Sequence, residues 1–341
     1  RNYLLSVKTA LADDLSRFRS IIARLERSDT GYTADKVVEV FSSPADCGGF
    51  LSFARQLIQE LKKIGKRRTA ETYTTALNSF LRFRGERDLL FEEADSNLMV
   101  EYETFLKGIN VCPNSSSFYM RNLRAIYNRA VERELTVQRY PFKHVYTGVD
   151  KTVKRAVPLK VIRRIRDLDL TLSPVLDYAR DLFMFSFYTR GMAFVDMAYL
   201  KKKDLQNGVL AYRRQKTGQQ LFIRWEKPMQ EIIDKYDTSG TPYLLPIIRD
   251  MKEDARKQYK SEAHRENQSL KKIGKLLGLA IPLTSYVARH SWASIAKSKN
   301  IPIATISEAM GHDSENTTRI YLASLDTTVV DKANSLILKS L

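Results

Sequence analysis

The stretch Gly311-His312-Asp313-Ser314-Glu315-Asn316-Thr317-Thr318-Arg319-Ile320-Tyr321 carries the pattern that decides the fold and the chemistry of this chain. It places a histidine nine residues before a tyrosine, with a predicted helix start between them. A tyrosine phenol has a pKa near ~10 and is protonated at neutral pH, so a lone tyrosine is a poor nucleophile. It becomes a useful one where cations and hydrogen-bond donors surround it and hold an electrophile in line. The function therefore depends on whether other residues supply those cations.

The composition favours a polyanionic partner. The chain has 341 residues, and its 43% hydrophobic content is enough for the cores of two or three domains. Lys and Arg number 56 against 39 Asp and Glu, and the net charge of +17 favours nucleic acid or an acidic membrane surface. The alternative is a protein with many solvated lysines. No run approaches the ~18 apolar residues of a spanning helix, so we expect no membrane partner.

The sequence gives no sign of a metal site or a nucleotide cofactor. Cys47 and Cys112 are isolated, which argues against a disulfide framework and fits a reducing cytoplasm. Neither a GxxxxGK[ST] nor a GxGxxG loop occurs. The four histidines show no zinc-ligand spacing; they are His144, His264, His290 and His312. We therefore expect chemistry without a metal and without a cofactor.

The first part of the chain reads as a small all-helical block. One helix is predicted to begin at an N-cap at Thr69 and to end at Gly85, and the next is predicted to be capped by Ser96 and to end before Gly108. A third helix is predicted from Ser116 to Val131, with four arginines projecting from it or just after it: Arg121, Arg124, Arg129 and Arg133. A basic stripe of this kind fits a solvated face as well as a DNA surface.

The second part contains the only convincing β signal. Ser173 and Pro174 predict a helix start as N-cap and N1. Val209–Tyr212 and Leu221–Ile223 flank the turn 215–218, as the strands of a hairpin do. The fold class is therefore mainly α with a small antiparallel β-sheet (α+β).

These patterns predict four segments. Residues 1–60 form a helical N-terminal extension, and the absence of a starting methionine suggests that an arm-binding module precedes it. Residues 61–147 form a helical core-binding domain, and the polar stretch 148–156 is the linker. Residues 157–341 form a catalytic domain that ends in an amphipathic helix, which packs either on a neighbouring protomer or on its own core.

Four cationic positions can turn Tyr321 into a nucleophile. Lys216 lies in the hairpin turn, where a flexible ammonium can reach a phosphate or protonate a leaving alkoxide. Arg289 lies near a helix start, a place that attracts anions, and a guanidinium can bind two phosphate oxygens. Arg190 follows an apolar helix, where an arginine is unexpected, and His312 follows Gly311, which resembles the residue that ends a helix. Each of these residues also has a purely structural interpretation.

Together they resemble the boxes of the tyrosine recombinases, also called the phage integrase family. Gly311–Tyr321 resembles the carboxyl-terminal box with its tyrosine. Arg289-His290-Ser291 is similar to the middle box, usually written HxxRH, and Lys216-Thr217-Gly218 is similar to the hairpin that carries the catalytic lysine. The resemblance covers residues 157–325 closely and the first block more loosely. It implies a core-binding domain with a SAM-like fold followed by a catalytic domain.

The resemblance also implies a mechanism. Tyr321 would attack the scissile phosphate to give a 3′-phosphotyrosyl link and a free 5′-hydroxyl. Arg190, Arg289 and His312 would stabilise the pentacoordinate phosphorane, and Lys216 would act as general acid towards the 5′-oxygen. A hydroxyl of a second strand would then reverse the step, with no metal or cofactor.

Two positions depart from the family pattern. The family's first arginine stands further along than Arg190, at a position occupied here by Met192 or Ala193, depending on the end from which one counts. Arg190 is the only arginine nearby, so we expect it to substitute. Tyr286 occupies the place of the HxxR histidine, where a phenol can donate a hydrogen bond but does not easily shuttle a proton at neutral pH.

The leading hypothesis is a cytoplasmic, nucleoid-associated site-specific recombinase or integrase of a mobile element. It would act on double-stranded DNA as a homotetramer, with the monomer as the free form and an accessory DNA-bending protein as a further candidate partner. One alternative is a catalytically degenerate relative that binds DNA without cutting it. Another is a type IB topoisomerase, which uses the same chemistry without synapsis.

Overall fold

The chain divides into two compact units, Arg1–Lys151 and Thr152–Leu341. The computed structural model describes residues 32–42, 49–86, 88–150 and 155–322, with residue 338 and a scatter of positions between 8 and 26. The predicted C-terminal helix lies outside the described residues apart from Leu338, and part of the predicted N-terminal extension does too. Within the described part, no helix is long and apolar enough to cross a membrane.

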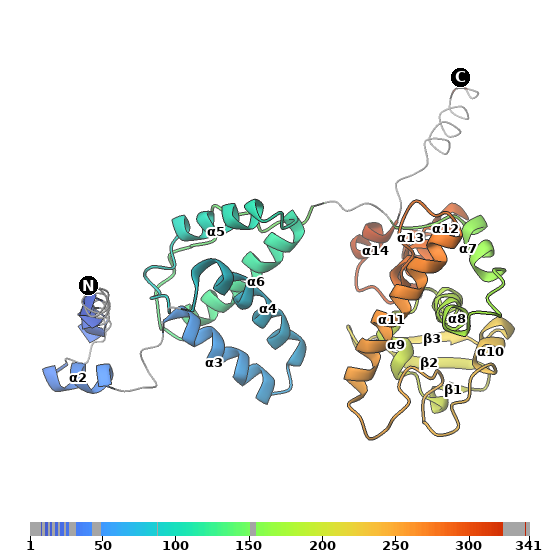
Figure 1. Cartoon of the computed structure of the whole chain (residues 1–341), viewed down its shortest axis with the longest axis horizontal. Coiled ribbons are helices and arrows are strands. Elements are labelled where there is room, and N and C mark those ends of the chain that lie inside the picture. Colours follow the sequence, from blue (N-terminus) through green and yellow to red (C-terminus); the bar gives the residue numbers. More distant parts are fainter. Residues whose placement is uncertain are drawn as a thin grey trace. The chain divides into compact units, whose positions relative to one another are not determined.

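The first unit is all-helical, as predicted, and its helices α3, α4 and α6 lie side by side (Figure 1). Their apolar faces meet that of α5 in one core around Phe50, Phe80, Tyr102 and Tyr127. The described helices are α2 (Ala34–Ser42), α3 (Phe50–Lys63), α4 (Arg67–Arg84), α5 (Ser96–Gly108) and α6 (Pro113–Glu132).

Helix α4 begins earlier than predicted, directly after Lys66 rather than after Thr69. The turn that closes α3 explains this difference. Gly65 has φ of 77°, and the amide of Lys66 donates to the carbonyl of Leu61, so this turn is complete at Lys66. Thr69 therefore lies inside the first turn of α4, whereas the predicted end at Gly85 is confirmed.

Helix α5 is capped by Asp95 rather than by Ser96. The carboxylate of Asp95 accepts a hydrogen bond of 2.8 Å from the amide of Leu98, and Ser96 is the first helical residue. The next helix, α6, begins at Pro113 and is longer than predicted, because proline suits the first helical position. In both cases the predicted helix exists, and it begins earlier in the sequence than predicted.

The predicted division at residue 60 falls inside α3. The buried residues of α3 run from Phe50 to Leu61 and belong to the same core as those of α4 and α6. We therefore assign α3 as a whole to the helical unit, and the four-segment division of the chain stays a proposal.

The second unit combines helices with a three-stranded antiparallel sheet of order β1-β2-β3 (Figure 1). Helix α8 packs against α11, α12, α10 and α7, and its buried apolar residues are central to the core. The elements are α7 (Leu159–Arg166), α8 (Pro174–Tyr188), α9 (Phe194–Tyr199), η1 (Lys202–Asp204), β1 (Leu205–Gln206), β2 (Val209–Arg213), β3 (Gln220–Arg224), α10 (Lys227–Ile233), α11 (Ala255–Leu276), α12 (Ser285–Ser298), α13 (Ile303–Met310) and α14 (Glu315–Tyr321).

The predicted fold class is confirmed: a mainly helical chain carries one small antiparallel sheet. Helix α8 begins at Pro174 after Ser173, as predicted. The hairpin also forms where it was expected, with Leu210 opposite Ile223 and Tyr212 opposite Leu221. Leu210 and Tyr212 are both buried, because residues two apart on a strand share one face.

Candidate active site

Arg289 is the centre of a buried polar cluster in the second unit. It lies in α12, which begins directly after Thr284, and only 3% of its surface is exposed. Its Nη1 donates to the carbonyl of Gly191 at 2.7 Å, and its Nη2 donates to the carbonyl of Met310 at 2.7 Å. Nη2 also lies 2.8 Å from Nε2 of His312. One guanidinium thus joins the turn after α8 to the end of α13.

The turn after α8 fits Arg289 because it contains a glycine. Gly191 has φ of 74°, and a Cβ on it would lie 2.6 Å from Cα of Arg289. A side chain at this position would therefore be strained twice, by its backbone conformation and by the close approach of α12. Gly191 was not among the residues predicted from the sequence.

His312 lies in a turn, as predicted, because Gly311 ends α13 with φ of 63°. Its Nδ1 lies 2.8 Å from Oγ1 of Thr318, a fully buried residue of α14. Burial and, to a smaller extent, the charges of Arg289, Arg214 and Lys216 together lower the pKa of His312 from 6.5 to about 4. The imidazole is therefore neutral at physiological pH.

Arg214 also belongs to this cluster, although it was not predicted from the sequence. It is 7% exposed, and its Nη1 donates to the carbonyl of Gly311. Its Nε is buried without a hydrogen-bond partner and lies 3.8 Å from the Asp196 carboxylate. The alternation of side chains along β2 could have identified Arg214. Leu210 and Tyr212 point into the core, and Arg214, two residues after Tyr212, is expected on the same face.

Asp196 supports Arg214 from helix α9. Its side chain is 4% exposed, and its Oδ1 accepts a hydrogen bond of 2.8 Å from the amide of Gln215. Burial raises the pKa of Asp196, while the Gln215 amide and the Arg214 and Arg289 charges oppose that rise. Asp196 thus fixes both the side chain of Arg214 and the start of the turn that carries Lys216.

Arg190 lies beside the cluster and makes fewer contacts with it. It has φ of 61°, an uncommon backbone conformation for a residue other than glycine. The described residues show no hydrogen bond or ion pair that joins Arg190 to Arg289, His312 or Lys216. Its side chain is half-buried, and its charge is close enough to Tyr212 to act on the pKa of that phenol. Its membership of the site stays a prediction.

Lys216 and Tyr286 are both exposed. Lys216 lies in the hairpin turn that Gly218 closes by donating its amide hydrogen to the carbonyl of Arg214. Tyr286 is 46% exposed, and its ring packs edge-on against His290, one turn later on α12, with the centroids 5.4 Å apart. Lys216 is near enough to act on the pKa of His312, whereas no described contact joins Tyr286 to that histidine.

Tyr321 is the last residue of α14. Ser314 caps this helix, and its hydroxyl accepts a hydrogen bond from the amide of Thr317 at 3.4 Å. A small apolar cluster from α12, α13 and Leu322 packs in the same region, and α14 contacts both α12 and α13. The backbone of Tyr321 is thereby held by the helices that carry Arg289 and precede His312.

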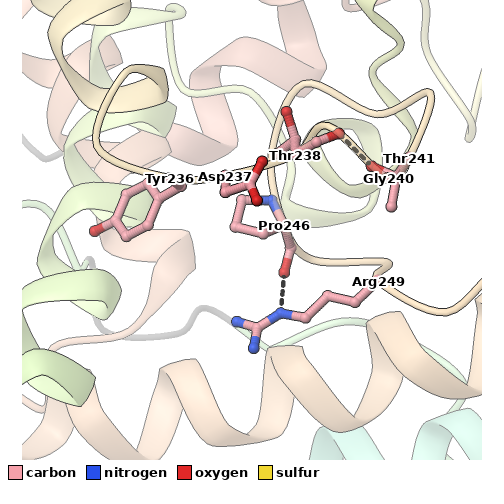
Figure 2. A pocket seen from close by; sticks show the side chains of 7 residues that line it. All are labelled: Tyr236, Asp237, Thr238, Gly240, Thr241, Pro246 and Arg249. Carbon is pink, nitrogen blue, oxygen red and sulfur yellow. Dashed lines mark hydrogen bonds between the residues drawn. The ribbon is translucent and has the colours of Figure 1, made fainter.

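A separate cavity of about 370 Å³ lies at the loop after α10 (Figure 2). Arg249 lines it and is already engaged, since its Nε donates to the Pro246 carbonyl at 2.7 Å and its guanidinium lies over the Tyr178 ring. None of the predicted site residues lines this cavity. Among the described residues, no group of three or more His, Cys, Asp or Glu side chains could hold a metal ion.

Comparison with known proteins assigns both units to characterised families. Residues 49–145 match the phage integrase SAM-like domain, and residues 162–328 match the phage integrase family. A curated relative, tyrosine recombinase XerA of Pyrococcus furiosus, is 29% identical over 153 residues, which is 42% of this chain and 50% of that protein. The chain thus spans about half the length of this relative.

Solved structures show the same fold at low identity. A lambda integrase dimer bound to a COC′ core site has a TM-score of 0.60 at 15% identity, covering 80% of this chain and 76% of that one. XerH site-specific recombinase bound to difH substrate has a TM-score of 0.58 at 16% identity, covering 94% of this chain and 93% of that one.

Proposed function

Because the chain belongs to the phage integrase family of tyrosine recombinases, we propose that it is a site-specific recombinase or integrase acting through a covalent 3′-phosphotyrosyl intermediate. The observation that carries this proposal is the buried pair Arg289 and His312, at 2.8 Å, with Tyr321 on the helix that follows His312. Such a pair presents a guanidinium and an imidazole where a phosphate oxygen would gain charge.

In the proposed cleavage step, the Tyr321 hydroxyl attacks the scissile phosphorus and loses its proton. The bond from phosphorus to the 5′-oxygen breaks, and Lys216 donates a proton to that oxygen. Arg289 and the other cations stabilise the added negative charge of the phosphorane. A 5′-hydroxyl of a second strand then attacks the phosphotyrosyl bond and releases Tyr321.

Two residues are candidates for the role of the family's first arginine. The sequence favours Arg190, which is nearest to the usual position. The geometry favours Arg214, because its guanidinium is buried in the cluster, contacts the Gly311 carbonyl beside His312 and has an Nε without a hydrogen-bond partner. We propose that Arg214 contributes charge to the phosphate and that Arg190 shapes the turn after α8.

We propose double-stranded DNA as the substrate and a homotetramer as the active assembly on it, with an accessory DNA-bending protein as a further partner. Two solved structures of one similar protein support this proposal, since lambda integrase is seen as a dimer on a core site and as a tetramer on a Holliday junction. On α6, Arg121 and Arg124 are exposed, whereas Arg133, just after the helix, is paired with Glu60 at 2.6 Å. The first two are therefore the better candidates for phosphate contacts.

A trapping experiment tests the proposed activity. The Tyr321→Phe variant would select binding sites from a pool of random duplexes, and the selected site would then be nicked near the cleavage position to trap the intermediate. We expect the unaltered chain to form a denaturant-resistant adduct with this DNA and Tyr321→Phe to form none. Salt-sensitive binding without an adduct would instead support the degenerate DNA-binding relative. Relaxation of supercoiled DNA without joined partner duplexes would support a topoisomerase.

A further inference from the structure

The hydrogen bonds of His312 determine which of its ring nitrogens carries the proton. Arginine has five N–H donors and no acceptor, so Nη2 of Arg289 can only donate to Nε2 of His312, at 2.8 Å. Nε2 is therefore the acceptor nitrogen. The proton of the neutral ring lies on Nδ1, which donates it to Oγ1 of Thr318 at 2.8 Å.

Thr318 combines two properties that suit it to this task. Its side chain is fully buried, so no solvent competes for the proton on Nδ1. It also lies three residues before Tyr321 on α14, and positions three apart lie on one face of a helix. The group that orients the imidazole and the proposed nucleophile are thus parts of one short helix.

We propose that Thr318 is a positioning residue that presents Nε2 of His312 as a proton acceptor, and that this nitrogen takes the proton of the Tyr321 hydroxyl during attack. The inference rests on the proposed function and gives His312 a role different from donating to the phosphate. In the step, the Tyr321 O–H bond breaks, its proton moves to Nε2 and its oxygen bonds to phosphorus, while the bond from phosphorus to the 5′-oxygen breaks and Lys216 protonates that oxygen. The resulting imidazolium keeps its Nδ1–H bond to Thr318. Tyr321 as nucleophile, His312 as base and Thr318 as orienting group then form the arrangement common to sites of nucleophilic catalysis.

In this tautomer, the neutral ring of His312 can use Nε2 only as a hydrogen-bond acceptor. With the proton on Nδ1, Nε2 has a lone pair and cannot donate to a phosphate oxygen. A substrate phosphate is a stronger acceptor for Arg289 than an imidazole, so the guanidinium turns towards it and releases Nε2. Thr318 is then the described partner that keeps the proton on Nδ1.

The charges around His312 keep it in the form that a base needs. Arg289 faces it from α12, Arg214 from the end of β2 and Lys216 from the hairpin turn, and burial acts in the same direction as these three cations. Asp196 lies behind Arg214 and Asp313 follows His312 in the exposed part of the turn. Tyr286, at the position of the family's HxxR histidine, is exposed and turned to His290. His312 is thus the better placed of the two to accept a proton.

A spectroscopic experiment tests the orientation without any DNA. In the 341-residue chain with ¹⁵N-labelled histidine, the resonances of His312 are assigned by comparison with His312→Gln. We expect a protonated Nδ1 and an unprotonated Nε2. In Thr318→Val this signature changes, in Thr318→Ser it is kept, and in the control Thr317→Val, which alters the neighbouring half-buried hydroxyl, it is also kept. A protonated Nε2 in the unaltered protein overturns the proposal.

A kinetic experiment tests the role in proton transfer. We expect Thr318→Val to slow single-turnover adduct formation roughly 10- to 100-fold, as a misplaced catalytic group does. Thr318→Ser should restore the rate, and Thr317→Val should leave it unchanged. Equal losses in Thr318→Val and Thr318→Ser overturn the proposal, because they show that Thr318 acts only through packing.

A sulfur-substituted substrate separates the base from the acid. When sulfur replaces the 5′-bridging oxygen, the leaving group needs no proton, so Lys216→Ala should recover its rate. Thr318→Val and His312→Gln should stay slow, because Tyr321 must still lose its proton. Recovery of Thr318→Val on this substrate overturns the proposal. If the unaltered protein forms no adduct on any selected DNA, the proposed function fails, whereas the tautomer measurement still reports on Thr318.

Discussion

Single residues of the candidate site act on more than one part of the fold. Arg289 donates to the Gly191 carbonyl after α8, to the Met310 carbonyl at the end of α13 and to His312. A lysine in its place has one compact ammonium and cannot bind several groups in fixed directions. The two further arginines differ in kind, because Arg214 joins this network and Arg190 lies next to it.

The first prediction compares Arg214→Ala with Arg190→Ala. We expect Arg214→Ala to slow adduct formation by about 10²-fold or more, the typical loss of one donor to a developing charge. On a duplex with a neutral methylphosphonate at the scissile position, its deficit should shrink, because little charge remains to be stabilised. A deficit of unchanged size would show that Arg214 acts only through packing, and a larger loss in Arg190→Ala would return the role to that residue.

At this scale the sequence indicated part of the site. Arg289 and His312 were predicted from motifs with fixed spacing, and the structure brings them together. Arg214 was not predicted, because its place in the site depends on two features of the folded chain. One is which face of β2 points inward, and the other is the contact with Gly311, which is distant in the sequence. Tyr321 and Lys216 stay predictions in their catalytic roles.

At the scale of elements, the turn between α8 and α9 positions Arg289 through a backbone hydrogen bond. Arg190 and Gly191 both have left-handed backbone conformations, with φ of 61° and 74°. They reverse the chain so that the Gly191 carbonyl reaches Arg289 on α12. The position of α12 relative to α8 is therefore set by backbone atoms as well as by side-chain packing.

The second prediction concerns Gly191→Ala. The added Cβ would lie 2.6 Å from Cα of Arg289, and the backbone is in a region that suits glycine. We expect the free energy of unfolding to fall by about 1–3 kcal/mol, and adduct formation to fall with it. Gly208→Ala is a matched control, since φ there is 71° and nothing lies within 4 Å of the added Cβ. Equal losses of stability in the two variants would refute the role of the close approach.

The third prediction concerns the cap of α5 in the first unit. Asp95→Ala removes the acceptor of the Leu98 amide and should lower the free energy of unfolding by about 0.5–2 kcal/mol. Ser96→Ala should have a smaller effect, because Ser96 is the first helical residue and not the cap. Chemical denaturation measures both, and a larger loss in Ser96→Ala would favour the cap predicted from the sequence.

Helices were predicted more reliably than their ends. Apolar periodicity identified α4, α5, α6 and α8 because it follows from the buried face of each helix. The start of α4 was wrong because the closing turn of α3 extends to Lys66, a feature that the residue types do not encode directly. Gly85 was predicted correctly because a glycine with positive φ has a distinct local signature.

At the scale of the whole molecule, each of the two units has its own core. The second unit also buries two ionisable groups, Glu266 and His312, that change its stability with pH in opposite directions. Burial, with the charge of Glu262, raises the pKa of Glu266 well above 4.5, and burial lowers that of His312 from 6.5 to about 4. Glu266 has a buried Oε2 without a hydrogen-bond partner.

The fourth prediction follows from Glu266. As pH rises above 4.5, the unfolded chain loses this proton while the folded chain keeps it, so the group destabilises the second unit increasingly until its folded pKa is passed. Glu266→Gln should therefore raise the free energy of unfolding at pH 8 by about 1–3 kcal/mol, and the gain should vanish near pH 4. The exposed Glu253→Gln is the control. A gain of equal size at both pH values would contradict this explanation.

The fifth prediction concerns His312, whose effect has the opposite sign. Below pH 6.5 the unfolded chain binds a proton that the folded chain does not bind until about pH 4. Stability from this group is complete above pH 6.5 and is lost as the pH falls, by about 3 kcal/mol in total. His312→Gln should flatten the stability profile between pH 4 and 6.5, and an unchanged profile would show that another group titrates there.

The bond from Arg214 to the Gly311 carbonyl links the hairpin to the turn that holds His312. A ligand that draws this guanidinium away must compete with that carbonyl, and a buried carbonyl left without a donor costs about 1–3 kcal/mol. In the proposed function that ligand is DNA, so the affinity for DNA and the order of the His312 turn are thermodynamically linked. Binding loosens the turn, and a turn that is already loose would in return bind DNA more tightly. In the proposed recombinase, selection for tight binding and selection for an ordered His312 would therefore act on this one bond in opposite directions.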